Sequence, residues 1–341
     1  MQNLWHKSDA LQCQDDLSLR VYSSRLLGQD KSLVLHGGGN TSVKLTQTNI
    51  FGEIEEVLYV KGSGWDLETI EAAGFAPVQM QYLLKLAKLK KMTDSQMVNE
   101  LKTHLLDANA PTPSVETILH ALLPYKYVDH THADAIISIT NTPTGKQRIE
   151  EIYGDSVVII PYIMPGFDLS LLCAQLFPAS KTSNTIGMVL LNHGIFSFGE
   201  SAKQSYDRMI DLVEKAEQYL QQQNAWDIVS AKKSAPAISH SDISNPDISN
   251  PSILNPGISD KRFPTIALAQ LRQKLSHKLK QAVIVKNFQS PAITHFCQHK
   301  ELARISQQGP ATPDHVIRTK QLPMIMHLEN KVLKAKGLKT N

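Results

Sequence analysis

The chain has 341 residues, of which 42% are hydrophobic and 20% are charged, and its formal net charge at pH 7 is +3. This composition predicts a globular protein with an ordinary apolar core. The small net charge gives no basic field of the kind that binds nucleic acid, and no apolar run is long enough to span a membrane. The length allows two domains, or one domain with an appendage.

Three cysteines and the first residues favour a reducing compartment. Cys13, Cys173 and Cys297 are few, odd in number and widely spaced, which argues against a disulfide framework. The N-terminus lacks a charged segment followed by an apolar run, so we expect no signal peptide. We therefore expect a cytoplasmic protein.

The first part of the chain predicts alternating helices and strands. The periodicities and turn residues predict helices over residues 8–28, 67–73, 77–91, 95–107, 114–124, 145–153, 168–177 and 200–223. They predict strands over residues 32–36, 42–45, 56–60, 128–139, 156–160 and 187–191. We assign residues 1–232 to one domain.

The character of the chain changes after this domain. Residues 233–261 repeat Ile-Ser-Asn-Pro and lack aromatic side chains, so we predict a flexible Ser/Asn/Pro linker. Residues 262–325 predict a small α+β module, and residues 326–341 a frayed basic tail. Within the module we expect helices over residues 265–281 and 293–307, a strand over residues 282–285, and a loop and strand over residues 309–319.

Two histidines open the strand predicted over residues 128–139. Side chains alternate along a strand, so His130 and His132 point the same way and form half of a divalent-metal site. His193 lies in an Asn-His-Gly turn that follows another predicted strand. A catalytic zinc takes about three protein ligands and an open position, which these three histidines can supply.

Glu116 lies at the start of a predicted helix, after Pro113 and Ser114. It can bind the metal or act as a base. The structural alternatives are that Glu116 only complements the helix N-terminus and that the histidines are ordinary polar residues of a strand and a turn. Each alternative suits one residue alone, but the combination favours a catalytic site. We assign His120 to a core or supporting role, because a fourth histidine would close the site.

Two glycine-rich stretches, residues 37–40 and 62–64, each follow a predicted strand. Glycine allows consecutive backbone N–H groups to point at one anion, and Asn40, Ser42 and Ser63 add side-chain donors. Neither stretch matches a P-loop or a dinucleotide-binding fingerprint. Simple tight turns explain them equally well.

These motifs together resemble one known family. They are Gly39-Asn40-Thr-Ser, Gly62-Ser-Gly64, Pro113-Ser114-Val-Glu116-x-x-x-His120, His130-x-His132 and Asn192-His193-Gly194. In this order, over residues 20–225, they resemble the class II aldolase/adducin family. The phrases at 35–44, 60–66 and 312–320 are similar to the aldolase half of bifunctional rhamnulose-1-phosphate aldolase/alcohol dehydrogenase proteins.

The resemblance implies a three-layer α/β/α fold around a mainly antiparallel central sheet, in a homotetramer. It implies Zn²⁺ on His130, His132 and His193, with Glu116 as the general base. The phosphate-binding positions that it implies are Gly39, Asn40, Ser63, Gly64 and Ser114. The activity that it implies is retro-aldol cleavage of a ketose 1-phosphate, with L-rhamnulose 1-phosphate expected, to dihydroxyacetone phosphate and L-lactaldehyde.

The sequence departs from the family pattern at two points. Val115 stands where a second serine is frequent, and no tyrosine aligns clearly with the family's proton donor, for which Tyr153 and Tyr162 are candidates. We hypothesise that His315 or Arg318 closes over the substrate phosphate and adds charge that Val115 does not supply, although a module that only covers apolar surface is the simpler interpretation. The residues after 320 contain no stretch expected to hold a nicotinamide cofactor.

Two other functions use the same residues. A sugar-phosphate 4-epimerase or a dehydratase would share the zinc site and the phosphate loops. A metal-free, adducin-like scaffold is a third alternative, which the presence of all three histidines and Glu116 disfavours.

Overall fold

The structure is a computed structural model that describes residues 1–226, 265–316, 319–329 and 332–335. The chain divides into two compact units. The first comprises residues 1–226 and 310–321, and the second comprises residues 227–309 and 322–341. The linker predicted over residues 233–261 lies outside the described residues, and so does Arg318.

A seven-stranded sheet forms the centre of the first unit, with the strand order β3-β2-β1-β4-β7-β6-β5. Its strands are β1 (Asn40–Thr48), β2 (Ile54–Lys61), β3 (Phe75–Gln79), β4 (Tyr127–Thr131), β5 (Val157–Ile160), β6 (Gly187–Leu190) and β7 (Gly194–Gly199). All neighbouring strands are antiparallel except β5 and β6, which are parallel. The expected mainly antiparallel sheet is therefore confirmed.

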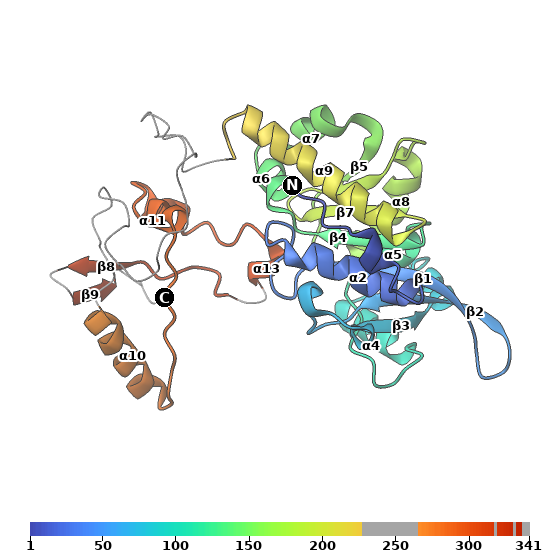
Figure 1. Cartoon of the computed structure of the whole chain (residues 1–341), viewed down its shortest axis with the longest axis horizontal. Coiled ribbons are helices and arrows are strands. Elements are labelled where there is room, and N and C mark those ends of the chain that lie inside the picture. The colour runs from blue at the N-terminus through green and yellow to red at the C-terminus, as the bar shows by residue number, and fades with distance from the viewer. Residues whose placement is uncertain (227–264, 317–318, 330–331, 336–341) are drawn as a thin grey trace. The chain divides into compact units, whose positions relative to one another are not determined.

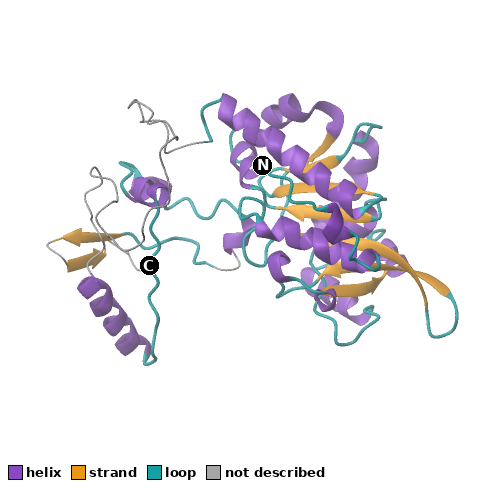
Figure 2. Cartoon of the chain, in the orientation of Figure 1, coloured by secondary structure: helices purple, strands orange, loops and turns teal. Residues whose placement is uncertain are grey.

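Helices cover both faces of this sheet (Figure 1 and Figure 2). One face carries α2 (Asp16–Gln29), α6 (Asp134–Thr140), α7 (Gly145–Tyr153) and α9 (Ala202–Gln222), which share one apolar cluster. The other face carries α3 (Met80–Leu86), α4 (Asp94–Thr103), α5 (Thr117–Leu122) and α8 (Phe167–Ser180). The remaining elements of the unit are α1 (Lys7–Ala10), α13 (Pro313–Val316) and three short 3₁₀ helices, Leu67–Thr69, Ala72–Gly74 and Gly154–Ser156.

The longest helix, α9, shows why these layers form. Met209, Leu212, Val213 and Ala216 recur at helical spacing and are all buried against the sheet. Burial of one such leucine contributes about 1.5–3 kcal/mol relative to exposure. The three-layer α/β/α fold follows from an apolar stripe of this kind on each covering helix.

The strand predicted over residues 128–139 is wrong in its second half. β4 ends at Thr131, and Asp134–Thr140 forms α6. A short apolar run with β-branched residues fits a strand or a buried helix, and here Ile136 and Ile139 pack into the cluster that contains α9. His132 consequently lies just beyond the strand rather than on it.

Three further strand assignments also differ. Residues 32–36 form turns rather than a strand, and β7 was not predicted. β3 occupies the start of the helix predicted over residues 77–91. It is an edge strand that contains Pro77, and an edge position tolerates the missing N–H of proline.

The second unit contains α10 (Thr265–Leu279), α11 (Pro291–Cys297) and α12 (Leu302–Ile305). It also contains an antiparallel hairpin of β8 (Met326–Glu329) and β9 (Val332–Ala335), within the residues predicted to be a frayed tail. Residues 282–285, which the structure describes, form neither helix nor strand. Residues 310–321, which we assigned to the module, group with the first unit and contain a short helix rather than a strand.

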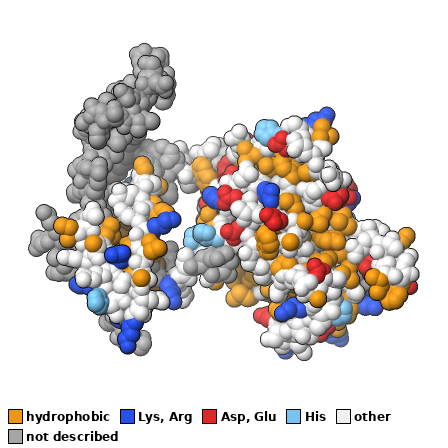
Figure 3. All heavy atoms as spheres, turned by 60° about the horizontal axis from the view of Figure 1, so that its bottom comes forward, with side chains coloured by type: hydrophobic (Ala, Val, Ile, Leu, Met, Phe, Trp, Pro, Cys, Tyr) orange, Lys and Arg blue, Asp and Glu red, His pale blue; other side chains and the backbone are white. Residues whose placement is uncertain are grey.

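The surface of the first unit carries many exposed apolar side chains (Figure 3). Three of them, Ile50, Phe51 and Ile54, are at least 77% exposed in and beside the turn between β1 and β2. Within the described part of the chain, none of the helices combines the length and the apolar character needed to cross a membrane.

Candidate metal and catalytic site

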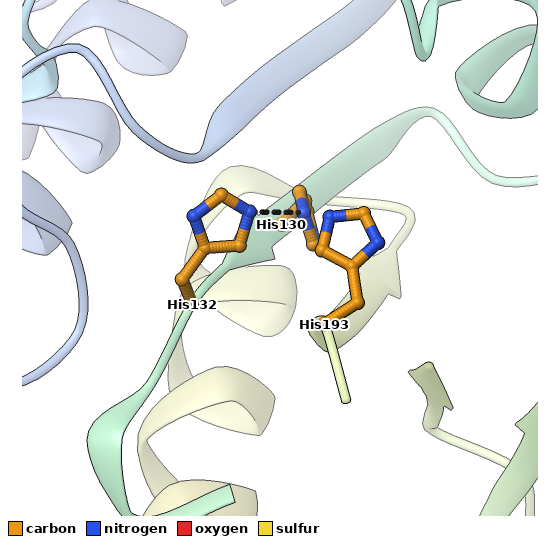
Figure 4. Close-up of side chains that lie close together, drawn as sticks. All are labelled: His130, His132 and His193. Atoms are coloured by element: carbon orange, nitrogen blue, oxygen red, sulfur yellow. Dashed lines mark hydrogen bonds between the residues drawn. The ribbon is translucent and has the colours of Figure 1, made fainter. Parts of the chain in front are cut away.

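Three histidines from two segments meet at one end of β4 (Figure 4). His130 is on β4, His132 follows its last residue, and His193 precedes β7. One side-chain nitrogen from each residue lies within 4.8 Å of the corresponding nitrogens of the other two. The structure thus brings together the three predicted metal ligands, although one of them is not on a strand.

The pairing of β4 with β7 explains why these segments meet. His130 lies opposite Phe196 in this antiparallel pair, so the residues just before β7 reach the end of β4. Asn192 adopts a left-handed conformation (φ 58°) in the tight connection between β6 and β7. A Cβ atom on Gly194 would lie 2.4 Å from the Thr131 carbonyl oxygen and 3.0 Å from His130 Cε1. Only glycine allows this approach.

Hydrogen bonds on the far side of two rings set their tautomers. His130 Nδ1 donates to the Ile195 carbonyl at 3.1 Å, and His132 Nδ1 donates to a carboxylate oxygen of Asp314 at 2.5 Å. With their protons on Nδ1, both rings present the lone pair of Nε2, and these two atoms lie 3.1 Å apart. Two facing lone pairs repel each other unless a proton or a metal ion lies between them.

Glu116 lies beside the same nitrogens, at the N-cap position of α5. Its Oε2 is 3.5 Å from His130 Nε2, and its Oε1 is 3.6 Å from His193 Nε2. Among the residues that the structure describes, Oε1 and His193 Nδ1 are buried without a hydrogen-bond partner. Buried polar atoms of this kind cost free energy, so they indicate a place where a ligand binds.

Burial keeps two of the imidazoles neutral near pH 7. It lowers the pKa of His193 to about 4 and the pKa of His130 well below its usual value. Burial by itself would raise the pKa of Glu116, but attraction to His130 and His193 and a hydrogen bond from Asn40 lower it to about 2. Neutral imidazoles and an ionised carboxylate are the forms that bind a divalent cation.

A buried hydrogen-bond chain holds Glu116 from behind. Asn40 Nδ2 donates to Glu116 Oε2 at 2.6 Å, and Asn40 Oδ1 accepts from His120 Nε2. His120 Nδ1 then accepts from the Ser42 hydroxyl at 2.8 Å. Burial lowers the pKa of His120 to about 3, so its ring is neutral and donates through one nitrogen only. His120 therefore orients Asn40, and through it the carboxylate.

The glycine stretch at residues 37–40 packs tightly beside the histidines. Gly39 has φ +62°, and a Cβ there would lie 2.6 Å from Val34 Cγ1 and 2.8 Å from the His130 carbonyl oxygen. Lys61 Nζ donates to the Gly37 carbonyl at 2.8 Å, which joins this stretch to the end of β2. The sequence motif did not identify this lysine contact, although Lys61 directly precedes the second glycine stretch.

The other predicted anion-binding residues fall into two groups. Ser114 Oγ accepts from Asn40 Nδ2 at 3.1 Å and from the Glu116 amide at 3.2 Å, so it lies at the carboxylate. Ser63 and Gly64 lie in an exposed turn, where the Ser63 amide already donates to the Thr112 carbonyl at 2.8 Å. The structure places Asn40 and Ser114 together, and leaves Ser63 and Gly64 open to solvent.

The two candidate tyrosines occupy different environments. The Tyr153 hydroxyl donates to the Leu212 carbonyl at 2.6 Å inside the cluster beneath α9, and burial raises its pKa. Its proton is therefore engaged in the core. Tyr162 is 55% exposed. Val115, at the position where the family frequently has serine, is also exposed.

The residue that sequence reasoning missed is Asp314, on α13. Its side chain is 2% exposed and contacts both His132 and the Leu35 amide. It stands in the phrase Thr-Pro-Asp-His that drew attention to His315, but no local pattern links it to a residue 182 positions earlier. His315, for which we had hypothesised a phosphate contact, is hydrogen-bonded to the Thr312 hydroxyl at 2.5 Å.

Two family models match this chain. The family model described as the class II aldolase and adducin N-terminal domain matches residues 19–220. The chain belongs to the class II aldolase/adducin family. A second model, the aldolase class II second domain, matches residues 264–341. This match extends through the residues that we predicted to be a tail.

Individual relatives differ from this chain in the share of their length that it covers. The chain is 34% identical over 327 residues to the uncharacterized oxidoreductase YuxG of Bacillus subtilis (strain 168), covering 95% of this chain and 44% of YuxG. It thus spans less than half the length of that relative. The N-terminal class II aldolase domain of a conserved protein from Thermoplasma acidophilum is 46% identical, with a TM-score of 0.59, over 64% of this chain and 99% of that domain. A sugar-phosphate aldolase from Thermotoga maritima has 15% identity and a TM-score of 0.45, over 60% of this chain and 94% of its own.

The donor set of this class II aldolase family member fits a divalent metal. Zinc binds imidazole nitrogens at about 2.0–2.1 Å, so two tetrahedral ligands lie about 3.4 Å apart. The 3.1 Å separation of the His130 and His132 Nε2 atoms needs little adjustment to reach that value. The three histidines are therefore compatible with a metal site, and Glu116 lies close enough to contact the same ion or its substrate.

Proposed function

We propose that this class II aldolase family member cleaves a ketose 1-phosphate, with L-rhamnulose 1-phosphate as the first candidate substrate. The products would be dihydroxyacetone phosphate and L-lactaldehyde. The observation that supports this proposal best is the position of the Glu116 carboxylate. It lies within 3.6 Å of two histidine nitrogens, and its buried Oε1 has no hydrogen-bond partner among the described residues.

We assign the metal site to His130, His132 and His193, and the metal to Zn²⁺, because three nitrogen donors with an open position are typical of catalytic zinc. A bound Zn²⁺ would supply Lewis-acid polarisation of the substrate carbonyl. Of the three rings, His130 is held most firmly, because Phe196 stacks on it with centroids 4.2 Å apart.

The role of Glu116 follows from its hydrogen bonds. Asn40 holds Oε2, so Oε1 is the atom left to exchange a proton with substrate. In the condensation direction, Glu116 would accept the proton from the carbon of dihydroxyacetone phosphate that forms the new bond, and in cleavage it would return that proton. The ionised state of the carboxylate is the state that a base requires.

We assign the substrate phosphate to the glycine loops. Gly39, Asn40 and Ser114 line the inner side next to Glu116, and Ser63 and Gly64 form the open outer turn. The Lys61 ammonium, which contacts the Gly37 carbonyl, adds positive charge between the two loops. A dianionic phosphate bound there would place the sugar carbons toward the histidines.

The share of YuxG that this chain covers indicates the kind of protein to which the chain corresponds. We propose that the chain corresponds to the aldolase half of proteins that combine an aldolase with an oxidoreductase, because it covers 44% of YuxG. We also propose a homotetramer in the cytoplasm. The exposed apolar side chains Ile50, Phe51 and Ile54 support contacts between subunits, and the free cysteines suit a reducing compartment.

The decisive experiment is a panel of ketose 1-phosphates, assayed for release of dihydroxyacetone phosphate with zinc-loaded and chelator-treated protein. We expect release from one stereoisomer, lost on chelation and reduced about 10²-fold or more in Glu116→Gln. Conversion of the sugar phosphate to an epimer without fragmentation would identify a 4-epimerase instead, and loss of water would identify a dehydratase. A protein that binds no divalent metal and turns over no substrate would be a scaffold.

A further inference from the structure

A segment far along the chain from the metal-site histidines completes their surroundings. Asp314 lies on α13, within residues 310–321 of the first unit. Its Oδ2 accepts a hydrogen bond from the Leu35 amide at 2.7 Å, and its Oδ1 accepts one from His132 Nδ1 at 2.5 Å. The carboxylate thus joins His132 to the backbone that precedes the first glycine stretch.

The segment packs closely against its neighbours, and Asp314 fits only beside a residue without a side chain. A Cβ atom on Gly38 would lie 1.6 Å from Asp314 Oδ1, so only glycine at position 38 leaves room for the carboxylate. Asn141 donates to the Ala311 carbonyl at 3.4 Å and accepts from Asn192 at 2.6 Å, the residue before His193. The segment therefore contacts His132 directly and is linked through Asn141 to the loop that carries His193.

The contact to His132 has a definite chemical consequence. A neutral imidazole carries one proton, and the nitrogen without the proton is the one that can bind a metal. An acceptor at Nδ1 keeps the proton there and leaves the Nε2 lone pair free. In His132, this Nε2 atom is the one that faces His130 Nε2.

His130 has several contacts that fix its ring, whereas His132 relies mainly on its hydrogen bond to Asp314. His130 is held by β4, by stacking on Phe196 and by the Ile195 carbonyl. His132 lies beyond the last residue of β4, and Asp314 is the acceptor at its Nδ1. Without that acceptor, His132 has two available tautomers and a less restricted ring.

We propose that Asp314 is a positioning residue of the metal site, which fixes the tautomer and orientation of His132. This inference rests on the metal site of the proposed function and extends it to the C-terminal part of the chain. Metal affinity then depends on docking of residues 310–316, and not only on the three ligands. The simpler alternative is that Asp314 only anchors this segment through the Leu35 amide.

Zinc affinity of the full-length protein tests the proposal. Metal-free wild type, Asp314→Asn and the control Val316→Ala are each titrated with Zn²⁺ in competition with a chromophoric chelator. In Asp314→Asn, the amide oxygen can still accept from Leu35, but its NH₂ group then faces His132 Nδ1 and favours the wrong tautomer. We expect zinc binding about 10–100-fold weaker. Val316, which is 67% exposed on the same helix, should tolerate alanine without change.

A second substitution tests the same contact from the opposite side. Gly38→Ala places a methyl group where Asp314 Oδ1 lies, and should weaken zinc binding although Asp314 is retained. In the Asp314→Ala background the carboxylate is absent, so Gly38→Ala should add little further loss. Equal losses in both backgrounds would show that the effect of Gly38→Ala does not pass through Asp314.

The histidine tautomer can be observed directly in the wild-type protein, with Asp314 and Gly38 unchanged. Nitrogen-15 spectra of metal-free protein, assigned with His132→Gln, should show the His132 proton on Nδ1. A proton on Nε2, or wild-type zinc affinity in Asp314→Asn, would overturn the role of Asp314 alone. A wild-type protein that binds no zinc would overturn the metal site itself, and this inference with it.

Discussion

His130 and His132 are two residues apart, but different parts of the chain hold them. His130 belongs to β4, and its neighbours are Phe196 and the Ile195 carbonyl of the adjacent strand. His132 lies past the end of β4, and its partner is Asp314, 182 positions away. Sheet pairing positions the first histidine, whereas the second is hydrogen-bonded to a segment that returns to the site from the C-terminal region.

The largest expected effect comes from removing each histidine in turn. His130→Ala and His132→Ala should both strip most of the bound zinc, because a three-histidine site that loses one ligand keeps neither affinity nor geometry. They should differ in stability. His130 is fully buried, so His130→Ala should cost roughly 2–5 kcal/mol of unfolding free energy, and His132→Ala clearly less.

Metal analysis after gel filtration measures the zinc content. Thermal unfolding of the metal-free protein measures the stability. Equal losses of stability in the two variants would contradict the view that β4 holds His130 and that the segment with Asp314 holds His132. Unchanged zinc content in either variant would show that the histidine concerned is structural.

Glu116→Gln separates proton transfer from metal binding. The amide keeps the size of the side chain but cannot accept a proton, so we expect a loss of turnover of about 10²-fold or more. Zinc content should remain near that of the wild type. Steady-state turnover and metal analysis on the same preparation measure both quantities. A wild-type rate would show that Glu116 only complements the helix N-terminus.

Gly194→Ala and Gly64→Ala form a matched pair, one beside the histidines and one in the second glycine stretch. A methyl group at Gly194 meets the Thr131 carbonyl and the rings of His130 and His132. We expect a loss of stability of about 1–3 kcal/mol from this overpacking, together with weaker zinc binding.

At Gly64, where φ is +91°, the added methyl group meets no atom within 4 Å among the described residues. Only backbone strain remains, at about 1 kcal/mol, and zinc binding should be unchanged. Chemical denaturation measures the stability of the Gly194→Ala and Gly64→Ala variants, and a zinc titration measures their zinc affinity. Equal zinc affinities in both variants would show that the approach of β7 does not set the ligand geometry.

The last prediction concerns the buried hydrogen-bond chain behind Glu116. Ser42→Ala leaves His120 Nδ1 without its donor, which should cost about 1–3 kcal/mol of stability. Because the histidine ligands are not touched, zinc affinity should stay at the wild-type value. A large loss of zinc in this variant would mean that the network of Asn40 and His120 positions the ligands as well as the carboxylate.

Local sequence patterns determined much of the fold and most of the chemistry. The helix predicted over residues 145–153 has the bounds of α7. The apolar stripe of Met209, Leu212 and Ala216 identified α9. Both predictions succeeded because helical periodicity is a local property of the sequence. The three histidines and Glu116 stood out for the same reason, since their residue types and flanking motifs are visible in short stretches.

Tertiary structure decided the rest. Residues 134–140 became a helix because packing against the α9 side, and not their β-branched composition, sets their conformation. Pro77 entered a strand because that strand lies at the edge of the sheet. The contact between Asp314 and His132 depends on how residues 310–321 return to the first unit, and no local pattern encodes a hydrogen bond across 182 positions.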